Sequence, residues 1–139
     1  MPIVTDRGFA PDDLNHGFTP SGELPANGPF AIDVAPDADL NPVLARLSEA
    51  TAIRVAFPSF ADGRGFSIAR ALRRAGYTGR LRAKGHVIAD QYAMARRAGF
   101  DEVEIDDTLA ARQPEAQWLA RADWTAHDYQ VRLGRLRDG

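Results

Sequence analysis

Residues 52–76 read AIRVAFPSFADGRGFSIARALRRAG, and this stretch decides the fold class. Its first residues are rich in β-branched side chains that alternate, which is typical of a strand. A turn that contains glycine follows, and then Ile68, Ala69, Leu72 and Ala75 recur at helical spacing up to Gly76. The segment therefore predicts a strand, a turn and a helix in direct succession.

The same order of elements repeats on both sides of this segment. Upstream, FAIDV at 30–34 predicts a strand and LNPVLARLSEA at 40–50 predicts a helix. Downstream, the strand-like stretches GRLRAKG at 79–85 and DEVEID at 101–106 flank the helical stretch VIADQYAMARRAG at 87–99. Strands that alternate with helices form a parallel sheet with right-handed crossovers. We therefore expect an α/β fold with a four-stranded, mainly parallel sheet of consecutive strand-helix units.

The two ends of the chain differ from this alternating part. Residues 1–29 contain five prolines and several glycines, which predicts an irregular or hairpin-like N-terminal arm. Residues 30–139 are long enough for a single α/β domain but not for two. Within it, PEAQWLARAD at 114–123 predicts a further helix. Residues 124–139 form an amphipathic C-terminal tail that is a helix, a strand or a partner-docking segment, and the helix is the preferred interpretation.

Two predicted helices end in nearly the same way. Arg73-Arg74-Ala75-Gly76-Tyr77 and Arg96-Arg97-Ala98-Gly99-Phe100 both place cations at the negative end of the helix dipole, before a glycine. A glycine in this position takes the left-handed conformation and lets the aromatic residue fold back on the last turn. We interpret the repeat as a shared way to stop a helix and not as a functional duplication.

The predicted strands carry charge on one face, whereas buried parallel strands are normally apolar throughout. Arg54 alternates with apolar neighbours in its strand, as do Arg82 and Glu104 in theirs. Two interpretations remain open. In a half-barrel-like sheet this face is enclosed and Arg82 pairs with Glu104 across neighbouring strands, with Asp33 as a further acid. In an open sheet this face meets solvent, the N-terminal arm or another subunit, and in the simplest case its charges are solvated.

Composition excludes several classes of function. The formal charge of −2 creates no general field for nucleic acid or an anionic membrane, and no run of about 18 apolar residues predicts a membrane span. The N-terminus does not resemble a secretory signal, so we expect a cytoplasmic protein. The chain has no cysteine, which excludes disulfides, thiolate metal sites and cysteine-ligated iron–sulfur clusters. His16, His86 and His127 share no ligand spacing, and we expect no metal and no cofactor.

The turn in the opening stretch is a candidate anion site. Gly63 and Gly65 would let backbone amides approach an anion, while Arg64 offers a fork of donors and Ser67 a hydroxyl. The carboxyl end of a strand is also where α/β folds place ligands. In the alternative interpretation, Asp62 or Ser67 caps the helix, the glycines only make the turn, and Arg64 is solvated or paired with an acid.

The end of the next predicted strand adds further polar side chains. Arg82, Lys84 and His86 lie there, and we expect them to join Arg64 at one cationic rim if the two strands are neighbours. His86 is a candidate acid or base, because a histidine can give or take a proton near neutral pH. Asp90 is a second candidate proton carrier, although a carboxylate in the first turn of a helix also serves as a cap.

Residues 57–105 resemble a bacterial family of unknown function, domain-of-unknown-function family 934. The motifs that carry the resemblance are FP, DGRGFS, AR-x-LR, G-x-LRA-x-G, DQ and GFD in this order. Members of this family are often encoded beside assimilatory sulfite reductase and are described as probable oxidoreductases of sulfite reduction. The resemblance covers about a third of the chain closely, and the family's signature polar residues fall on Asp62, Arg64, Ser67, Arg70, Arg82, Asp90 and Gln91. This chain departs from the family pattern at Arg80 and His86.

The resemblance implies a role in sulfur metabolism. Reduction of sulfite takes six electrons and uses a haem-like centre with an iron–sulfur cluster, for which this chain has no cysteine ligands. We therefore expect an accessory protein that docks on sulfite reductase or its electron donor, with an anion-binding rim. The alternative is a small enzyme or sensor for a phosphorylated or sulfur-containing metabolite. A third interpretation is a structural subunit that covers its charged sheet face by forming a homodimer.

Overall fold

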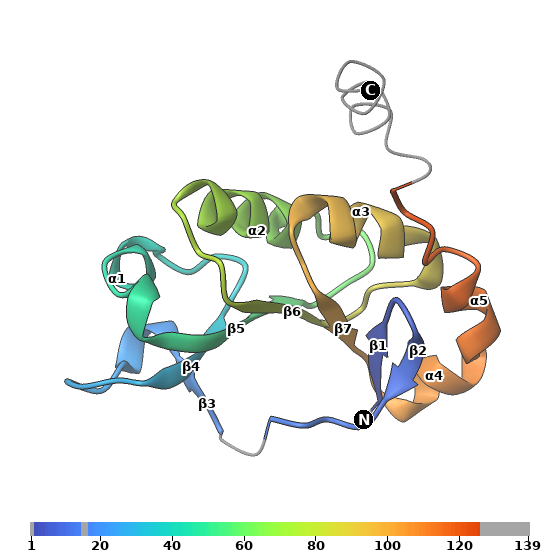
Figure 1. Cartoon of the computed structure of the whole chain (residues 1–139), viewed down its shortest axis with the longest axis horizontal. Helices are drawn as coiled ribbons and strands as arrows, with labels where there is room; N and C mark the ends of the chain where they lie inside the picture. The colour runs from blue at the N-terminus through green and yellow to red at the C-terminus, as the bar shows by residue number, and fades with distance from the viewer. Residues whose placement is uncertain (1, 15–16, 126–139) are drawn as a thin grey trace, which may run out of the picture.

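The computed structural model describes residues 2–14 and 17–125, which fold around one mixed sheet of seven strands (Figure 1). The order across the sheet is β2-β1-β7-β6-β5-β4-β3. Strands β3 to β7 are parallel and follow one another in chain order, whereas β1 pairs antiparallel with both β7 and β2. The strands are β1 (Ile3–Thr5), β2 (Gly8–Ala10), β3 (Phe18–Pro20), β4 (Phe30–Val34), β5 (Ala50–Phe57), β6 (Arg80–Gly85) and β7 (Glu102–Glu104).

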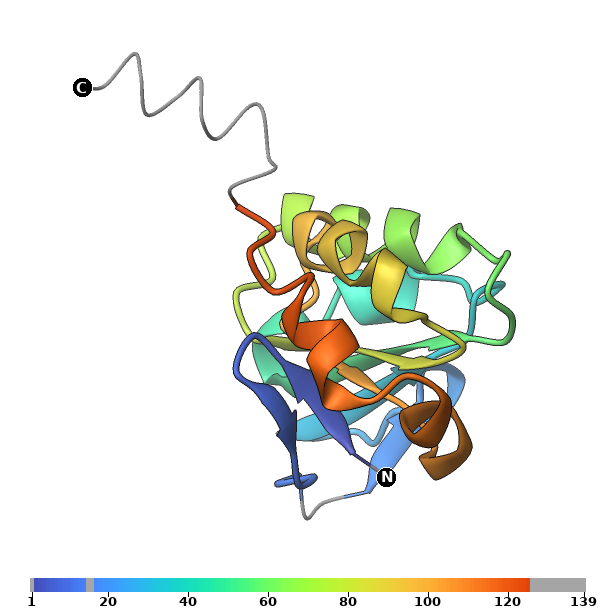
Figure 2. The same ribbon diagram turned by 90° about the vertical axis from the view of Figure 1, so that its right-hand side faces the viewer.

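The larger helices cover one face of the sheet. In Figures 1 and 2, α2 and α3 lie side by side above the strands, with α1 farther along the same face, while α4 and α5 lie beside the β1–β2 hairpin. Within the described ranges, no helix is long and apolar enough to cross a membrane. The helices are α1 (Asn41–Leu44), α2 (Arg64–Arg74), α3 (Tyr92–Ala98), α4 (Asp107–Arg112) and α5 (Glu115–Leu119), with 3₁₀ turns η1 (Ser21–Glu23), η2 (Leu47–Glu49) and η3 (Ala89–Gln91).

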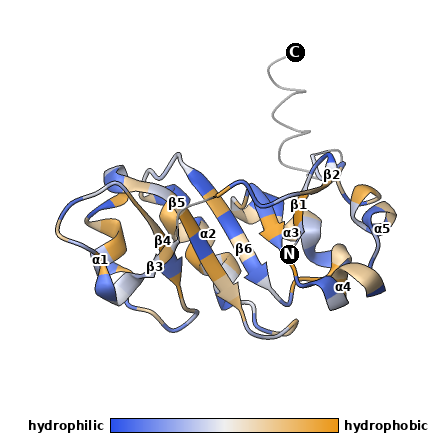
Figure 3. Cartoon of the chain, turned by 90° about the horizontal axis from the view of Figure 1, so that it is seen from below, coloured by the Kyte–Doolittle hydropathy of each residue, from blue (hydrophilic) through white to orange (hydrophobic). Residues whose placement is uncertain are grey.

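Alternation along the strands separates an apolar face from a polar one. Ile53 and Val55 of β5 and Leu81 of β6 are fully buried in one core with Leu72 of α2. The residues between them point to the opposite side of the sheet. Seen from below, the colours along β5 and β6 accordingly alternate between hydrophobic and hydrophilic (Figure 3). We call this second side the polar face; it carries Asp33, Arg54, Arg80, Arg82, Lys84, Glu102 and Glu104.

The predicted helix ends are confirmed. Gly76 and Gly99 have φ angles of 103° and 119°, in the left-handed region that favours glycine. Beyond each glycine, a backbone amide returns to the helix: Tyr77 N–H donates to Leu72 O, and Phe100 N–H donates to Ala95 O, both at 3.0 Å. Both aromatic side chains are buried, so the repeated sequence serves helix termination.

The prediction of a four-stranded, mainly parallel sheet is wrong, because the sheet has seven strands and is mixed. The four expected strands are present as β4 to β7. The other three come from the arm for which irregular or hairpin-like structure is expected: β1 and β2 form an antiparallel hairpin, which agrees with the second alternative, and β3 forms one edge of the sheet. Each has only three residues, too few for an alternating pattern, and Pro20 is tolerated because β3 is an edge strand.

Two predicted helices differ from the observed ones in length. The stretch 40–50 contains only the four residues of α1 and the separate turn η2. The helix expected at 114–123 is present as α5, which follows Pro114. The helical interpretation of the tail concerns mainly residues 126–139, which lie outside the described residues.

Candidate functional site

A pocket of about 450 Å³ opens at the carboxyl ends of four parallel strands. This is the edge at which α/β folds place their ligands, since strand ends and the loops after them converge there. Most of the wall is apolar, and four side chains add polar groups. The lining residues are Pro20, Ser21, Asp33, Val34, Ala35, Ala56, Phe57, Pro58, Lys84, Gly85 and His86.

Gly85 shapes the inner wall of this pocket. Its φ is 119°, and a Cβ built on it would lie 2.5 Å from the carbonyl oxygen of Phe57. Glycine therefore allows β6 to end in close contact with β5, and the next residue, His86, donates its N–H to the same oxygen at 2.9 Å. The backbone at the end of β6 thus fixes the position of the His86 Cα, from which the side chain extends.

The imidazole of His86 has a defined orientation at the pocket. Its Nδ1 lies 2.8 Å from the carbonyl oxygen of Pro58. A carbonyl oxygen only accepts hydrogen bonds, so Nδ1 carries a hydrogen and Nε2 is the nitrogen left to bind or release a proton. The ring of Phe60 packs against the imidazole edge-to-face, with 5.1 Å between the ring centroids. This contact holds the ring from a second direction.

Lys84 supplies a cation at the border between the pocket and the polar face. Its Nζ lies 3.9 Å from Oε2 of Glu104, beyond hydrogen-bond distance, and its side chain is 40% exposed. Among the described residues, no hydrogen bond occupies its three N–H donors. Lys84 therefore combines a long-range ionic contact with donors that are free for a ligand.

Asp33 also lines the pocket, but Arg54 occupies both of its oxygens. Nε and Nη2 of Arg54 donate to Oδ1 and Oδ2 of Asp33 at 2.6 and 2.7 Å, and Nη1 donates to Glu104 at 3.1 Å. The ring of Phe18 covers this guanidinium, with 3.9 Å from Cζ to the ring centroid. Burial alone would lower the pKa of Arg54, but Asp33 and Glu104 outweigh it and the pKa is raised.

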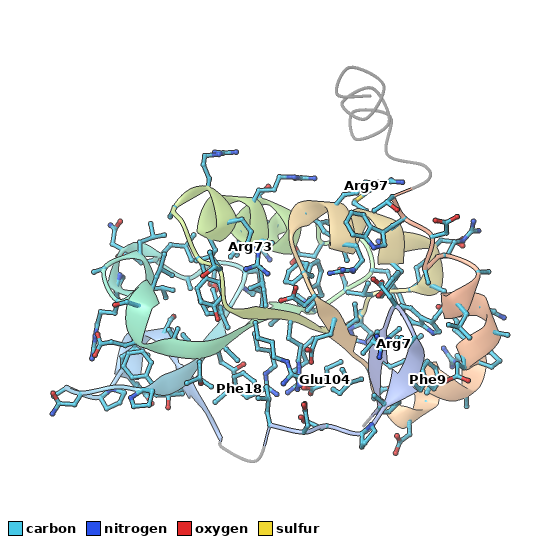
Figure 4. All side chains as sticks on the ribbon, in the orientation of Figure 1. Arg7, Phe9, Phe18, Arg73, Arg97 and Glu104 are labelled. Carbon is cyan, nitrogen blue, oxygen red and sulfur yellow. The ribbon has the colours of Figure 1, made fainter. Side chains whose placement is uncertain are left out.

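The polar face behind the pocket is a network of ion pairs, as the interpretation with paired charges predicts, and it is covered by the N-terminal arm, as one alternative for an open sheet predicts. The expected cross-strand pair of Arg82 and Glu104 is confirmed, with 2.8 Å between Nη1 and Oε1. Arg82 also bonds to Glu102, which is shared with Arg80. All three of Arg82, Glu102 and Glu104 are buried. Below the sheet, Figure 4 shows Phe18 and Glu104 on the same side of the strands.

Residues of the N-terminal arm close this network. Oδ1 of Asp12 lies 3.2 Å from Nη2 of Arg82, and Oδ1 of Asp13 lies 2.6 Å from Nη2 of Arg80. Burial raises the pKa of Asp12, but Arg82 and the hydrogen bond from the Leu14 amide together outweigh it and the pKa is lowered. The hydrogen bond from Arg80 lowers the pKa of Asp13. The N-terminal arm therefore covers the arginines of the polar face with the carboxylates of Asp12 and Asp13 and the ring of Phe18.

The polar and glycine residues of the turn before α2 make contacts within the turn and with β5. Arg64 forms a fork on Asp62, with its Nε at 3.0 Å from Oδ1 and its Nη2 at 2.7 Å from Oδ2, and its backbone N–H also donates to Oδ1. A Cβ at Gly65 would overlap the ring of Phe57, so this glycine permits helix–strand packing. Asp62 thus accepts the first N–H of α2 from the position before the N-cap residue Gly63, while Gly63 and Ser67 are exposed.

The structure separates the members of the expected cationic rim. Lys84 and His86 line the pocket together. Arg82 is buried on the polar face, and Arg64 lies in the helix layer on the other side of the sheet, so the two do not share a surface. Asp90 is paired with Arg121 at 2.8 Å and does not line the pocket. His16 and His127 lie outside the described residues.

Sequence reasoning missed two contributors to the pocket. Ser21 and the carbonyl of Pro58 enter it from η1 and from the end of β5. Ser21 becomes visible as a candidate only when β3 is known to lie next to β4. The Pro58 carbonyl carries no sequence signal, because every residue has this group.

A family model described as "Bacterial protein of unknown function (DUF934)" matches residues 22–136. This range covers the strands β4 to β7 and helices α1 to α5 of the described residues. No curated protein and no solved structure matches the chain.

Proposed function

The chain belongs to this bacterial family of unknown function, and from that premise we propose that it is an accessory protein of assimilatory sulfite reduction that binds a small organic anion. The observation that carries the binding part is the pocket at the ends of β3 to β6, with Lys84 and His86 in one wall. The link to sulfite reduction, including docking on sulfite reductase or its electron donor, rests on the motifs that resemble the family encoded beside that enzyme.

The chemistry of the pocket defines the class of ligand. Proline, valine and phenylalanine side chains line much of it, and a volume of about 450 Å³ is in the range that holds small organic ligands. The ammonium of Lys84 favours an anionic group on that ligand. Asp33 does not oppose this, because its charge is neutralised by Arg54 at two contacts. A phosphorylated or sulfur-containing metabolite has both an apolar body and an anionic end.

His86 gives the site a group that can exchange a proton with the ligand. With Nδ1–H committed to Pro58, Nε2 can accept a proton from a bound acid or, once protonated, donate a hydrogen bond to an anionic oxygen. Lys84 and His86 are two residues apart at the end of one strand, so both can contact the same ligand. This arrangement supports the enzyme or sensor interpretation of the site within the same cellular role.

Calorimetry with defined probes tests the binding part. We expect phenyl phosphate and benzenesulfonate to bind more tightly than inorganic phosphate and sulfite, since only the former fill the apolar wall. Lys84→Met should weaken binding about tenfold or more, the usual loss for a charge-assisted hydrogen bond. Arg7→Met, at an exposed site in the β1–β2 turn, removes the same charge and should leave binding unchanged. Equal affinities of Lys84→Met and the native protein would refute the site.

Growth of a deletion strain tests the cellular part. We expect the strain to grow poorly with sulfate or sulfite as the sulfur source and normally with cysteine, and the native gene to restore growth. Complementation by Lys84→Met should fail under the same conditions. Normal growth of the deletion strain on sulfite, together with no association with sulfite reductase on co-purification, would contradict the proposed role.

A further inference from the structure

The segment 63–100, which contains α2, β6 and α3, holds a concentration of positive charge of which only Lys84 lines the proposed pocket. Residues 63–100 contain nine of the 17 Lys and Arg residues of the chain but only one of its 19 acids, Asp90. The remainder therefore has eight cations and 18 acids. Although the net charge is only −2, the charge is strongly segregated along the chain. The segment 63–100 includes α2 and α3, which pack side by side on one face of the sheet.

Most cations of this segment have a carboxylate nearby within the described residues. Six of the nine have a carboxylate within 4.0 Å. They are Arg64 with Asp62, Arg73 with Asp101, Arg80 with Glu102, Arg82 with Glu104, Lys84 with Glu104 and Arg96 with Asp6.

Arg70, Arg74 and Arg97 are the three that have no such partner among residues 2–14 and 17–125. All three are exposed. Arg70 and Arg74 are one turn apart on α2, and Arg97 is on α3; its only described polar contact is a 3.1 Å hydrogen bond from Nη2 to the carbonyl oxygen of Trp124. In Figure 4, Arg97 lies on the helix side, away from the sheet.

We propose that Arg70, Arg74 and Arg97 form a docking surface on α2 and α3 for an acidic patch of another protein. We call these three residues the arginine triad. Guanidinium groups are the side chains best suited to pair with surface carboxylates, because each offers several donors in a planar fork. Met94, 48% exposed and one turn before Arg97 on α3, adds an adaptable apolar contact of the kind found at protein interfaces.

Charge segregation favours a protein partner over nucleic acid or a membrane. A nucleic acid extends beyond three arginines and would meet the acid-rich remainder of the molecule, and firm phosphate binding uses many more cations. Membrane binding by basic clusters typically uses four to eight Lys or Arg residues. An acidic patch on a protein has limited area, so it can meet the arginine triad while the remaining acids repel misoriented encounters.

Two double variants with the same net charge test the proposal. Arg70→Gln with Arg74→Gln removes two members of the arginine triad, while Arg7→Gln with Arg112→Gln removes two exposed arginines from the β1–β2 turn and α4. The probe is a fluorescent peptide of about 12 glutamates, followed by anisotropy at low ionic strength. We expect about fivefold weaker binding for the first double variant and less than twofold for the second. The affinity of the native protein should fall as salt is added.

The same experiment also tests three alternatives, which are a net-charge effect, nucleic-acid binding and membrane binding. Equal loss in both double variants would show a net-charge effect and overturn the proposal, as would absence of measurable peptide binding. Tighter binding of a 12-base-pair DNA duplex, or of vesicles containing phosphatidylserine, that is lost specifically with Arg70 and Arg74 would replace a protein partner by nucleic acid or membrane. Lys84→Met should bind the peptide normally, so failure of the pocket and failure of the arginine triad are distinguishable.

Discussion

Arg82 and Glu104 form an ion pair that is almost completely removed from solvent. Nη1 and Oε1 are 2.8 Å apart across β6 and β7, and the side chains are 0% and 4% exposed. Oε2 of Glu102 lies 2.7 Å from Nη2 of the same guanidinium. In a buried pair of this kind, loss of one partner leaves the other charge desolvated without compensation. The pair therefore makes the polar face sensitive to single substitutions.

Arg82→Met should reduce the free energy of unfolding by about 3–5 kcal/mol, because it leaves two buried glutamates short of a cation. Urea denaturation measures this, with the exposed Arg112→Met as a control that should change stability by about 0.5 kcal/mol or less. Adding Glu104→Met to Arg82→Met should recover part of the loss, since an apolar pair avoids desolvated charge. A loss below about 1 kcal/mol for Arg82→Met would contradict this account.

The sequence predicts the central strands and the Arg82–Glu104 pair because both depend on local patterns. Alternation of Ile53 and Val55 with Arg54 shows which side chains share a face, and consecutive strands make cross-strand partners foreseeable. The residues that cover the polar face, in contrast, come from a distant part of the sequence. Asp12 and Phe18 come from a region whose strands are three residues long, and they meet the arginines only after the chain has folded.

The candidate site is foreseeable in part for a similar reason. Lys84 and His86 end a predicted strand, so their place at the carboxyl edge of the sheet follows from that strand alone. The expected convergence of Arg64 with Arg82 is not found, because Arg64 lies in the helix layer, where Asp62 binds it, and Arg82 is buried on the opposite face of the sheet. Which face of the sheet the turn before α2 occupies depends on packing of Gly65 against Phe57, which no local pattern shows.

Asp12→Asn with Asp13→Asn should loosen the arm over the polar face without unfolding the protein. The two carboxylates are 38% and 65% exposed, so each pair contributes at most about 1 kcal/mol. We expect hydrogen exchange of the amides at residues 17–21 to become up to about tenfold faster, while protection of β5 and β6 is unchanged. Equal protection of residues 17–21 in both proteins would contradict a latching role for the two acids.

The contribution of these two acids should depend on pH in a defined direction. The pKa values of Asp12 and Asp13 are lowered from 3.8 by Arg82 and Arg80, so the folded state holds these carboxylates ionised more firmly than the unfolded state does. Their stabilisation is therefore complete above pH 3.8 and is lost as the pH falls through the lowered values. The exchange ratio between the double variant and the native protein should be constant at about pH 5–7 and approach one as the pH falls through the lowered pKa values.

The His86 ring should show an uncommon tautomer in solution. Because Nδ1 donates to the Pro58 carbonyl at 2.8 Å, the neutral ring carries its hydrogen on Nδ1 and not on Nε2. Nitrogen-15 NMR of the imidazole distinguishes the two forms, and His86→Gln assigns the signal among the three histidines of the chain. A neutral His86 that carries its hydrogen mainly on Nε2 would remove the proton-exchange role proposed for the pocket.

Gly85→Ala should damage both the stability and the pocket, whereas Gly63→Ala should be tolerated. At Gly85 the φ of 119° strains any residue with a Cβ, and that atom would lie 2.5 Å from the Phe57 carbonyl oxygen. We expect a loss of about 2 kcal/mol or more in the free energy of unfolding, measured by urea denaturation. Gly63 has a φ of −88°, and apart from its chain neighbours no heavy atom lies within 4 Å of the position that a methyl group would take there. Its substitution should therefore cost about 1 kcal/mol or less.

Because the Phe57 oxygen also accepts the His86 N–H, Gly85→Ala should shift the His86 ring signals while Gly63→Ala leaves them in place. Similar stability losses at the two glycines would show that the close approach of β6 to β5 does not position His86.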